Sequence, residues 1–315
     1  MFLLAAVSLP MIGQSNFVTV SDGHFLKDGQ PYYYVGTNFW YGAILGSEGQ
    51  GGNRERLVKE LDLMKRMGID NLRILVGSDG ERGVTTKVEP TLQVRPGVYN
   101  DTILAGLDYL LMEMGKREMV AVLYLNNSWE WSGGYGFYLE HAGAGKAPRP
   151  NEDGYPAYMN FVAQYASNQK AHELFYDYVR FILGRTNRYT GVAYKDDPAI
   201  MSWQIGNEPR AFSKEALPAF EKWLAEASAL IRSLDPNHLI SIGSEDSWGV
   251  RTTGTVMSAS VLTRMSTIVI STCGPITGVG RDRIISSTTC RRRRPTPRTI
   301  LINTWTSVPA CGSLW

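Results

Sequence analysis

Residues Ser202–Arg210, with the sequence SWQIGNEPR, carry the clearest chemical signal in the chain. A largely apolar run there ends in Asn207 and Glu208, and Pro209 then removes a backbone donor and turns the chain away from the preceding strand. Cleavage of a glycosidic bond needs a carboxylic acid that stays protonated in an aromatic-lined cleft, and Glu208 suits that role. Asn207 is suited to bind a sugar hydroxyl beside it. An Asn-Glu-Pro turn that only caps a helix is the alternative.

Four other residues of suitable type lie in or just after the expected strands. Trp40 follows the first strand, Arg73 lies within the second, and Asn127 and Trp129 follow the third. Because the carboxyl ends of parallel barrel strands meet on one face, we expect these residues to join Glu208 in one site. The alternatives are a structural ion pair for Arg73 and filling of the core for the tryptophans.

The chain from Phe17 to Gly249 alternates short β-branched or aromatic runs with longer amphipathic stretches, as is typical of β/α units. The runs predict strands at Tyr32–Gly36, Ile69–Val76, Met119–Leu125, Ala199–Ile205 and His238–Gly243. Apolar residues at helical spacing predict helices around Leu57, Leu61 and Met64, around Phe175, Tyr178, Val179 and Ile182, and around Phe220, Trp223, Leu224, Ala227 and Ile231. A doubly wound sheet shares this alternation, but no glycine-rich phosphate loop follows a strand. The pattern therefore favours a parallel β/α barrel.

Composition excludes several classes of protein and divides the chain in two. With 315 residues, 43% of them hydrophobic and 20% charged, the chain is an ordinary globular protein, and no apolar run is long enough to span a bilayer. Residues 251–315 hold nine Arg, no Lys and one acid, about +8, so that the net charge of +2 leaves about −6 for residues 1–250. We expect 251–315 to be an atypical Ser/Thr/Arg-rich tail that binds no nucleic acid.

The first residues have a different character. Met1–Gly13 is uncharged and too short to cross a membrane, so we interpret residues 1–16 as a signal-peptide-like segment and expect a secreted or periplasmic, cell-envelope protein. A buried first strand or a plug at the bottom of a barrel is the alternative.

Four segments together resemble glycoside hydrolase family 5 of clan A, and most of all its endo-β-1,4-mannanase branch: Gly36–Gly42, Asn71–Arg73, Leu125–Gly134 and Trp203–Arg210. The resemblance covers residues 17–250, which we take as the catalytic domain. It implies an α/β (β/α)8 TIM barrel and retaining hydrolysis by two glutamates. By motif, Glu208 matches the acid/base, Asn207 its partner and Arg73 the arginine that supports the nucleophile. Trp40, Asn127 and Trp129 match positions that hold sugars.

The second glutamate of the family has no counterpart, because no glutamate occurs after Glu245. A retaining mechanism places its two carboxylates about 5–5.5 Å apart, so this chain is expected to be inactive as written. We expect the barrel to be incomplete after the fifth β/α unit.

The tail itself suggests a reason. One choice of codons for Met265–Gly280, read from the third base, gives VDYSNIHMWPYNWGW, which resembles the sixth-strand segment of these mannanases. We therefore hypothesise that residues 251–315 are out of frame.

These observations predict a retaining endo-β-1,4-mannanase that acts on mannan, galactomannan or glucomannan. The alternatives are a β-1,4-glucanase on the same barrel and a catalytically dead glycan-binding barrel. We expect a β-mannan partner, a monomer, no cofactor and no metal site.

The frame hypothesis is tested by the nucleotide sequence from the codon of Ser244 onward, translated in three frames. We expect another frame to continue from the sixth-strand segment into a strand that ends in Glu-Phe-Gly. If no frame does so, residues 251–315 are a genuine tail, and the catalytically dead glycan-binding barrel becomes the favoured interpretation.

Overall fold

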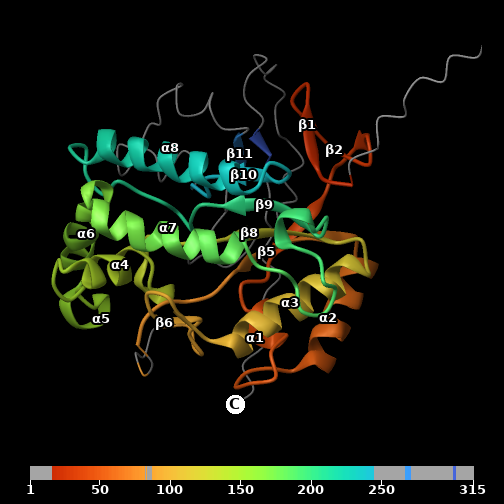
Figure 1. Ribbon diagram of the computed structural model, residues 1–315, viewed down its shortest axis with the longest axis horizontal. Coiled ribbons are helices and arrows are strands. Elements are labelled where there is room, and N and C mark those ends of the chain that lie inside the picture. Colours follow the sequence, from red (N-terminus) through yellow and green to blue (C-terminus); the bar gives the residue numbers. More distant parts are fainter. Residues whose placement is uncertain (1–15, 82, 84–86, 245–266, 271–300, 303–315) are drawn as a thin grey trace, which may run out of the picture.

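The computed structural model of the protein describes residues 16–81, 83, 87–244, 267–270 and 301–302. The signal-peptide-like segment, apart from Asn16, and most of the tail lie outside these residues. Figure 1 shows the described chain as a parallel sheet surrounded by helices, with the long helices α7 and α8 side by side on its outer face.

In the described part of the chain the main sheet contains seven strands, in the order β12-β11-β10-β9-β8-β5-β4. Each strand pairs in parallel with the next strand of this sheet along the chain, so the order never reverses as it would in a doubly wound sheet. The strands are β4 (Val35–Asn38), β5 (Ile69–Leu75), β8 (Val120–Tyr124), β9 (Ile200–Gln204), β10 (Leu239–Ser241), β11 (Thr267–Ile270) and β12 (Leu301–Ile302).

All five expected strands are present, although the first is displaced. It begins at Val35 rather than Tyr32, because the rings of Tyr32 and Tyr34 stack on each other with centroids 5.4 Å apart beneath the sheet. Aromatic residues have a high strand propensity. Here, however, Tyr32 and Tyr34 pack against the small apolar cluster at the amino-terminal ends of the strands.

The sheet continues beyond the fifth strand. β11 pairs with β10 and β12 pairs with β11, so that two short segments of the tail lie where later barrel strands would lie. Within the described residues β4 and β12 are not paired with each other, and the sheet stays open. The barrel is therefore incomplete, as predicted.

Helices follow β4, β5, β8 and β9 and cover the outside of the sheet. Asn side chains cap three of them: Asn53, Asn100 and Asn168 accept hydrogen bonds from backbone N–H groups in the first turns of α2, α3 and α7, and each such cap contributes about 1 kcal/mol. No described helix is long and apolar enough to span a membrane. The helices are α1 (Gly42–Leu45), α2 (Arg54–Arg66), α3 (Asp101–Gly115), α4 (Tyr135–Ala142), α5 (Pro150–Asp153), α6 (Tyr155–Val162), α7 (Gln169–Leu183) and α8 (Leu217–Leu234).

Short elements complete the fold. Among the residues that the structure describes, two small antiparallel sheets flank the main one, and three 3-10 turns lie in its loops. They are β1 (Thr19–Ser21), β2 (His24–Lys27) and β3 (Gln30–Pro31), then β6 (Gln93–Arg95) and β7 (Val98–Tyr99), and the turns Glu130–Ser132, Ala163–Ser167 and Tyr194–Asp196.

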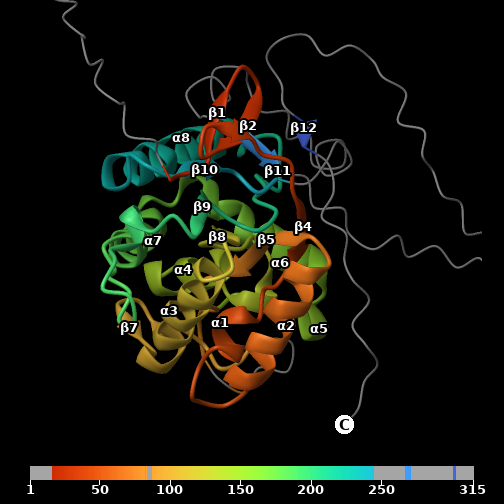
Figure 2. The same cartoon turned by 90° about the vertical axis from the view of Figure 1, so that its right-hand side faces the viewer.

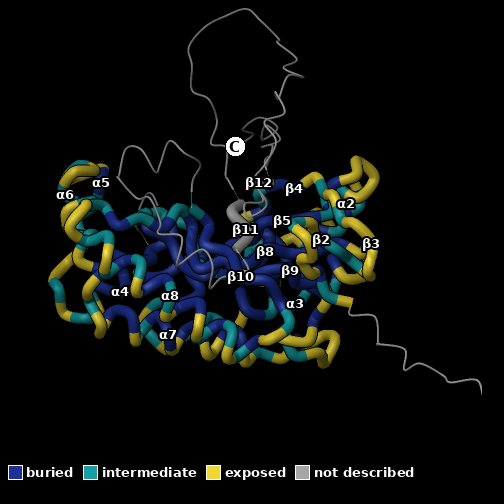
Figure 3. The backbone as a smooth tube through the Cα atoms, turned by 90° about the horizontal axis from the view of Figure 1, so that it is seen from above, coloured by how far each residue is buried: buried dark blue, intermediate teal, exposed yellow. Residues whose placement is uncertain are grey.

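The hydrophobic core has two parts, one on each face of the sheet. The larger lies between sheet and helices and includes the fully buried Trp203 of β9 and Trp223 of α8, the second of which the helical spacing predicted. The smaller lies inside the barrel, where Val122 and Met201 meet Phe25 of the β1–β2 hairpin. Figure 2 shows this hairpin at one end of the strands, and Figure 3 shows buried chain at the centre with exposed residues on the outer helices. The inner face of the sheet is thus apolar near the amino-terminal ends of the strands.

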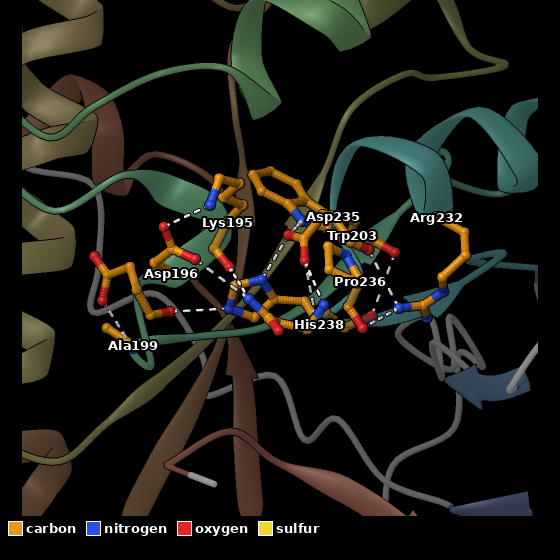
Figure 4. Close-up of polar contacts among 11 residues, drawn as sticks. Lys195, Asp196, Ala199, Trp203, Arg232, Asp235, Pro236 and His238 are labelled. Carbon is orange, nitrogen blue, oxygen red and sulfur yellow. Dashed lines mark hydrogen bonds and ion pairs between the residues drawn. The ribbon is translucent and has the colours of Figure 1, made fainter.

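A buried polar cluster connects the end of α8 to Trp203 of β9 and to His238, directly before β10. Asp235 Oδ2 accepts hydrogen bonds from Trp203 Nε1 at 2.7 Å and from His238 Nδ1 at 2.6 Å, as Figure 4 shows. The other ring nitrogen of His238 lies 2.9 Å from the carbonyl oxygen of Asp197. Burial opposes ionisation of Asp235, but the hydrogen bonds and charge of His238 and the hydrogen bond from Trp203 hold its pKa below the usual value.

We predict that Asp235→Asn lowers the free energy of unfolding by about 1–3 kcal/mol at pH 7, because the new amide faces two N–H donors. A lowered folded-state pKa gives stability that is present above the unfolded-state pKa, about 3.9, and lost as the pH falls through the folded-state pKa. Urea unfolding from pH 7 to pH 3 should therefore show the two proteins converging in acid. A difference that stays constant with pH would contradict this.

Candidate active site

The ends of β8 and β9 join through backbone hydrogen bonds just beyond the ladder. Asn127 and Asn207 form a parallel bridge, the N–H of Asn207 donates to the carbonyl oxygen of Asn126 at 2.8 Å, and the N–H of Ser128 donates to that of Asn207 at 3.3 Å. The two loops that carry the predicted site residues are therefore held together at their starting points.

The buried side-chain amide of Asn207 links two other predicted residues. Its Oδ1 accepts a hydrogen bond from Arg73 Nη2 at 2.9 Å, and its Nδ2 donates to Asn127 Oδ1 at 3.1 Å. Asn127 Oδ1 also accepts from the backbone N–H of Trp129 at 3.0 Å, and its Nδ2 donates to Ser132 Oγ at 2.8 Å. Arg73, Asn207, Asn127 and Trp129 thus form one continuous chain of hydrogen bonds.

Arg73 is 3% exposed and is held by neutral groups. Its Nε donates to Gln204 Oε1 at 2.7 Å, its Nη1 to Asn38 Oδ1 at 3.3 Å, and the guanidinium lies 4.2 Å from the ring centroid of Tyr124. Burial lowers the pKa of Arg73, while the charges of Tyr124 and Glu208 raise it. The hydrogen bonds of the guanidinium go to the amide oxygens of Gln204, Asn38 and Asn207.

Glu208 is half-buried and lies at the point where the chain leaves β9. Its φ of +49° is in the left-handed region, which costs a residue other than glycine roughly 1–2 kcal/mol. Its N–H donates to the carbonyl oxygen of Gly243 at 3.0 Å, and its own carbonyl oxygen accepts from Ser128 Oγ. Trp129 Nε1 donates to Oε2 of the carboxyl group at 2.7 Å. The strained backbone and these bonds give the carboxyl group a defined direction.

Trp129 is half-buried and is surrounded on several sides. Its ring meets Tyr155 and Phe212 edge to face, with centroids 6.0 and 5.6 Å away, and the Arg210 guanidinium lies 4.9 Å from its centroid. Trp129 thus packs against the edge of the main core while its indole N–H points at Glu208.

Trp40 lies at the surface, just beyond the end of β4. It follows the end of β4, is 41% exposed, and its ring meets that of Tyr41 with centroids 5.5 Å apart. Within the described residues it has no ring contact or hydrogen bond to the other five, so it stays a candidate at the edge of the site.

Sequence reasoning gave no role to Asn38, Gln204, Tyr124 or Ser128, which hold Arg73 and Glu208 in place. A signal did exist for Gln204: it is a polar residue in a buried strand and alternates with Trp203, which predicts a side chain on the inner face. The hydroxyl of Ser128 has no comparable signal, because it bonds to a backbone carbonyl across the site.

Asp79 was also missed and supports the loop after β8. It is buried, its Oδ1 accepts from Gln93 Nε2 at 3.1 Å, and its Oδ2 accepts from the N–H of Gly134 at 3.4 Å. Burial raises its pKa to about 7, against the lowering effect of these bonds and of the Lys87 charge. The described residues contain no group of three or more His, Cys, Asp or Glu that could hold a metal ion.

A family model described as "GH family 5 beta-mannosidase-like" matches residues 15–265. This is most of the chain, and the chain therefore belongs to glycoside hydrolase family 5.

Curated relatives have related names. The putative mannan endo-1,4-beta-mannosidase 9 of Oryza sativa subsp. japonica is 30% identical over 78% of this chain and 56% of its own length. Mannan endo-1,4-beta-mannosidase 7 of Arabidopsis thaliana is 30% identical over 74% of this chain and 50% of its own length. The chain spans about half the length of the curated relatives that it matches.

Solved structures agree with the fold. A glycoside hydrolase family 5 mannosidase from Rhizomucor miehei matches with a TM-score of 0.71 and 34% identity over 83% of this chain and 62% of its own. The endo-1,4-beta-mannanase from the same organism matches with a TM-score of 0.57 and 26% identity over 73% and 61%. These neighbours are (β/α)8 barrels, so the predicted fold class is confirmed.

We predict that Asn127→Ala lowers the free energy of unfolding by about 1–3 kcal/mol, because Asn207, Ser132 and the Trp129 backbone each lose a buried partner. Asn127→Asp is the matched control, since it keeps the acceptor and the hydroxyl of Ser132 can turn to donate to it. Denaturant unfolding and near-ultraviolet circular dichroism of Trp129 measure the effect. Equal losses in the two variants would contradict the assigned bonds.

Proposed function

We propose that this site is that of a retaining endo-β-1,4-mannan hydrolase, and that the 315-residue chain lacks the nucleophile that turnover needs. The observation that carries the proposal is the convergence of Glu208, Asn207, Arg73, Asn127 and Trp129 in one hydrogen-bonded group at the carboxyl ends of three neighbouring strands. The names of the curated relatives and family 5 membership favour mannan as the polymer.

In this proposal Glu208 is the general acid and base. Its carboxyl group gives a proton to the oxygen of the departing sugar, and the Trp129 indole, which already donates to Oε2, keeps the group in place. Asn207 cannot turn freely because Arg73 and Asn127 hold both ends of its amide. It would hydrogen-bond the sugar 2-hydroxyl, a contact that strengthens as positive charge develops on the ring.

Turnover requires a second carboxylate on the opposite side of the anomeric carbon, and the sequence has no glutamate after Glu245. The position of Arg73 suits such a group, because a buried guanidinium bound to amide oxygens keeps its full charge and favours an anion nearby. The proposal therefore assigns Arg73 to the nucleophile side of the site, and the chain retains the acid without its partner. Residues 1–16 lead us to propose a secreted or cell-envelope protein.

A β-1,4-glucanase is the rival within the same fold, and it would differ in how the site treats the axial 2-hydroxyl of mannose. A glycan-binding barrel is the rival from another class, and it shares the loss of turnover but needs no reactive geometry around Glu208. An external nucleophile such as azide can replace the missing carboxylate. Its effect on cleavage of mannose-based and glucose-based substrates distinguishes the proposal from both rivals.

We predict that azide restores cleavage of 2,4-dinitrophenyl β-mannobioside by this chain. Azide near Arg73 attacks the anomeric carbon, the bond to the phenolic oxygen breaks, dinitrophenolate leaves, and α-mannobiosyl azide forms. Because this leaving group needs no proton, Glu208 is not required for the step. We expect at least about tenfold faster release of dinitrophenolate with azide, measured by absorbance, and much slower release in Arg73→Met, which loses the buried charge.

The matched substrate is 2,4-dinitrophenyl β-cellobioside. Equal or faster azide-dependent release from it would favour the glucanase. Binding of mannooligosaccharides without any azide-dependent release would favour the glycan-binding barrel and contradict the proposed geometry.

A further inference from the structure

The loop Asn127–Gly134 of the candidate site is held by two neighbouring segments. Asn207, after β9, donates to the side chain of the first loop residue at 3.1 Å. Asp79, after β5, donates through its backbone N–H to the carbonyl oxygen of Ser132 at 2.9 Å, and its Oδ2 accepts from the N–H of Gly134 at 3.4 Å. Asp79 therefore contacts the far end of the loop through both its backbone and its side chain.

The end of this loop is packed too closely to move by itself. Gly133 and Gly134 both have positive φ, and a Cβ atom on Gly133 would lie 2.4 Å from the carbonyl oxygen of Asp79. A Cβ atom on Gly134 would lie 1.9 Å from the carbonyl oxygen of Asn127. The side chain of Asn127 in turn accepts a hydrogen bond from the backbone N–H of Trp129 at 3.0 Å. A displacement of Gly134 therefore also displaces Asn127 and Trp129.

The carboxyl group of Asp79 makes contacts that suit its ionised form. The residue is 3% exposed, and its two carboxyl oxygens accept from Gln93 Nε2 at 3.1 Å and from the backbone of Gly134 at 3.4 Å. Hydrogen bonds to an ionised acceptor are about twice as strong as neutral ones. A proton on Oδ2 would point an O–H group at the N–H of Gly134. Gain of a proton therefore weakens the longer of the two bonds, which is the one that holds the loop.

Burial moves the ionisation of this carboxyl group into the neutral pH range. It raises the pKa of Asp79 to about 7, and the hydrogen bonds from Gln93 and Gly134 and the charge of Lys87 act against that rise. An ordinary aspartate, with a pKa of about 3.9, stays ionised throughout this range. Asp79 can therefore exchange its proton under conditions in which the protein remains folded.

The titratable groups that act on Asp79 come from several elements. Four tyrosines lie near it on β7, α4, α7 and the turn Ala163–Ser167, and burial raises the pKa of each, so that they stay neutral at pH 7: Tyr99, Tyr138, Tyr178 and Tyr165. The charged groups that act on Lys87, besides Asp79, are Glu140, Glu81 and Arg149. Because the charge of Lys87 lowers the pKa of Asp79, removal of this charge is expected to raise it.

We propose that Asp79 is a positioning residue for the saccharide site, and that its ionised carboxylate keeps the loop Asn127–Gly134 in the geometry that binds the ligand. When the carboxyl group gains a proton, the bond to Gly134 weakens and the Trp129 indole leaves its position beside Glu208. The effect on saccharide binding rests on the proposed function, whereas the link between Asp79 and the loop does not.

The first experiment needs no saccharide. The Trp129 indole N–H signal of the full chain is followed by nuclear magnetic resonance from about pH 5.5 to about pH 8.5, and Trp129→Phe assigns it. We expect a transition with its midpoint near pH 7. Because the indole also contacts Glu208, two variants identify the source. The transition should disappear in Asp79→Asn, which keeps an acceptor for Gln93 but cannot ionise, and should remain in Glu208→Gln.

A second variant leaves the bonds of Asp79 intact. Lys87→Met should move the midpoint of the transition to higher pH, because it removes the positive charge that favours the carboxylate. Lys59→Met is the matched control, since Lys59 is an exposed lysine on α2 that pairs with Glu55 and should leave the midpoint unchanged. If Asp79→Asn does not fold, as judged by near-ultraviolet circular dichroism, this pair of variants decides the question.

The second experiment measures binding of β-1,4-mannohexaose at the two ends of the same pH range. We expect binding to be about fivefold weaker at the acid end, as suits the loss of roughly one hydrogen bond. Asp79→Asn should bind weakly at both pH values, because its amide resembles the protonated acid.

The outcomes separate this inference from the proposed function. Absence of the transition near pH 7, its persistence in Asp79→Asn, or a midpoint that Lys87→Met leaves unchanged overturns the role of Asp79. Binding that does not change with pH also overturns it, and leaves the proposed function intact. If the transition follows Asp79 but mannohexaose does not bind at either pH, the proposed function is wrong and the link between Asp79 and the loop stands.

Discussion

The geometry of the site depends on one buried guanidinium. Arg73 donates to amide oxygens on β4, on β9 and on the loop after β9, and its face lies against a tyrosine of β8. A charge that is 3% exposed is tolerated only where it is fully hydrogen-bonded, so the four strands around it must keep their register. Asn207 is hydrogen-bonded to Asn127, and Asn127 to the backbone of Trp129. The Trp129 indole in turn donates to the carboxyl group of Glu208, so the position of Glu208 depends on Arg73 through this chain of bonds.

The fold supplies this arrangement through the simplest order of parallel strands. Because each strand joins the one before it, the ends of β4, β5, β8 and β9 are neighbours, and residues separated by more than 130 positions in sequence come within hydrogen-bonding distance. The inner core and the hairpin beneath it fill the opposite end. The described sheet is nevertheless open between β4 and β12.

The sequence was informative where chemistry and periodicity coincide. Asn207, Glu208 and Arg73 could be grouped because strand ends converge, and the helices could be placed from apolar spacing. The roles of Asn38 and Gln204 depend on strand register, which a single sequence does not fix. The displaced first strand, the hydroxyl of Ser128 and the buried Asp79 depend on tertiary contacts that local propensity does not encode.

The central claim is that Asn207 and Glu208 face a β-mannan chain at the carboxyl ends of these strands. A crystal structure of this chain with bound β-1,4-mannohexaose tests it most directly. The account predicts a mannose 2-hydroxyl within hydrogen-bond distance of Asn207 and a glycosidic oxygen within hydrogen-bond distance of the Glu208 carboxyl group, with the saccharide intact. A saccharide bound elsewhere, with Asn207 and Glu208 untouched, would contradict the account.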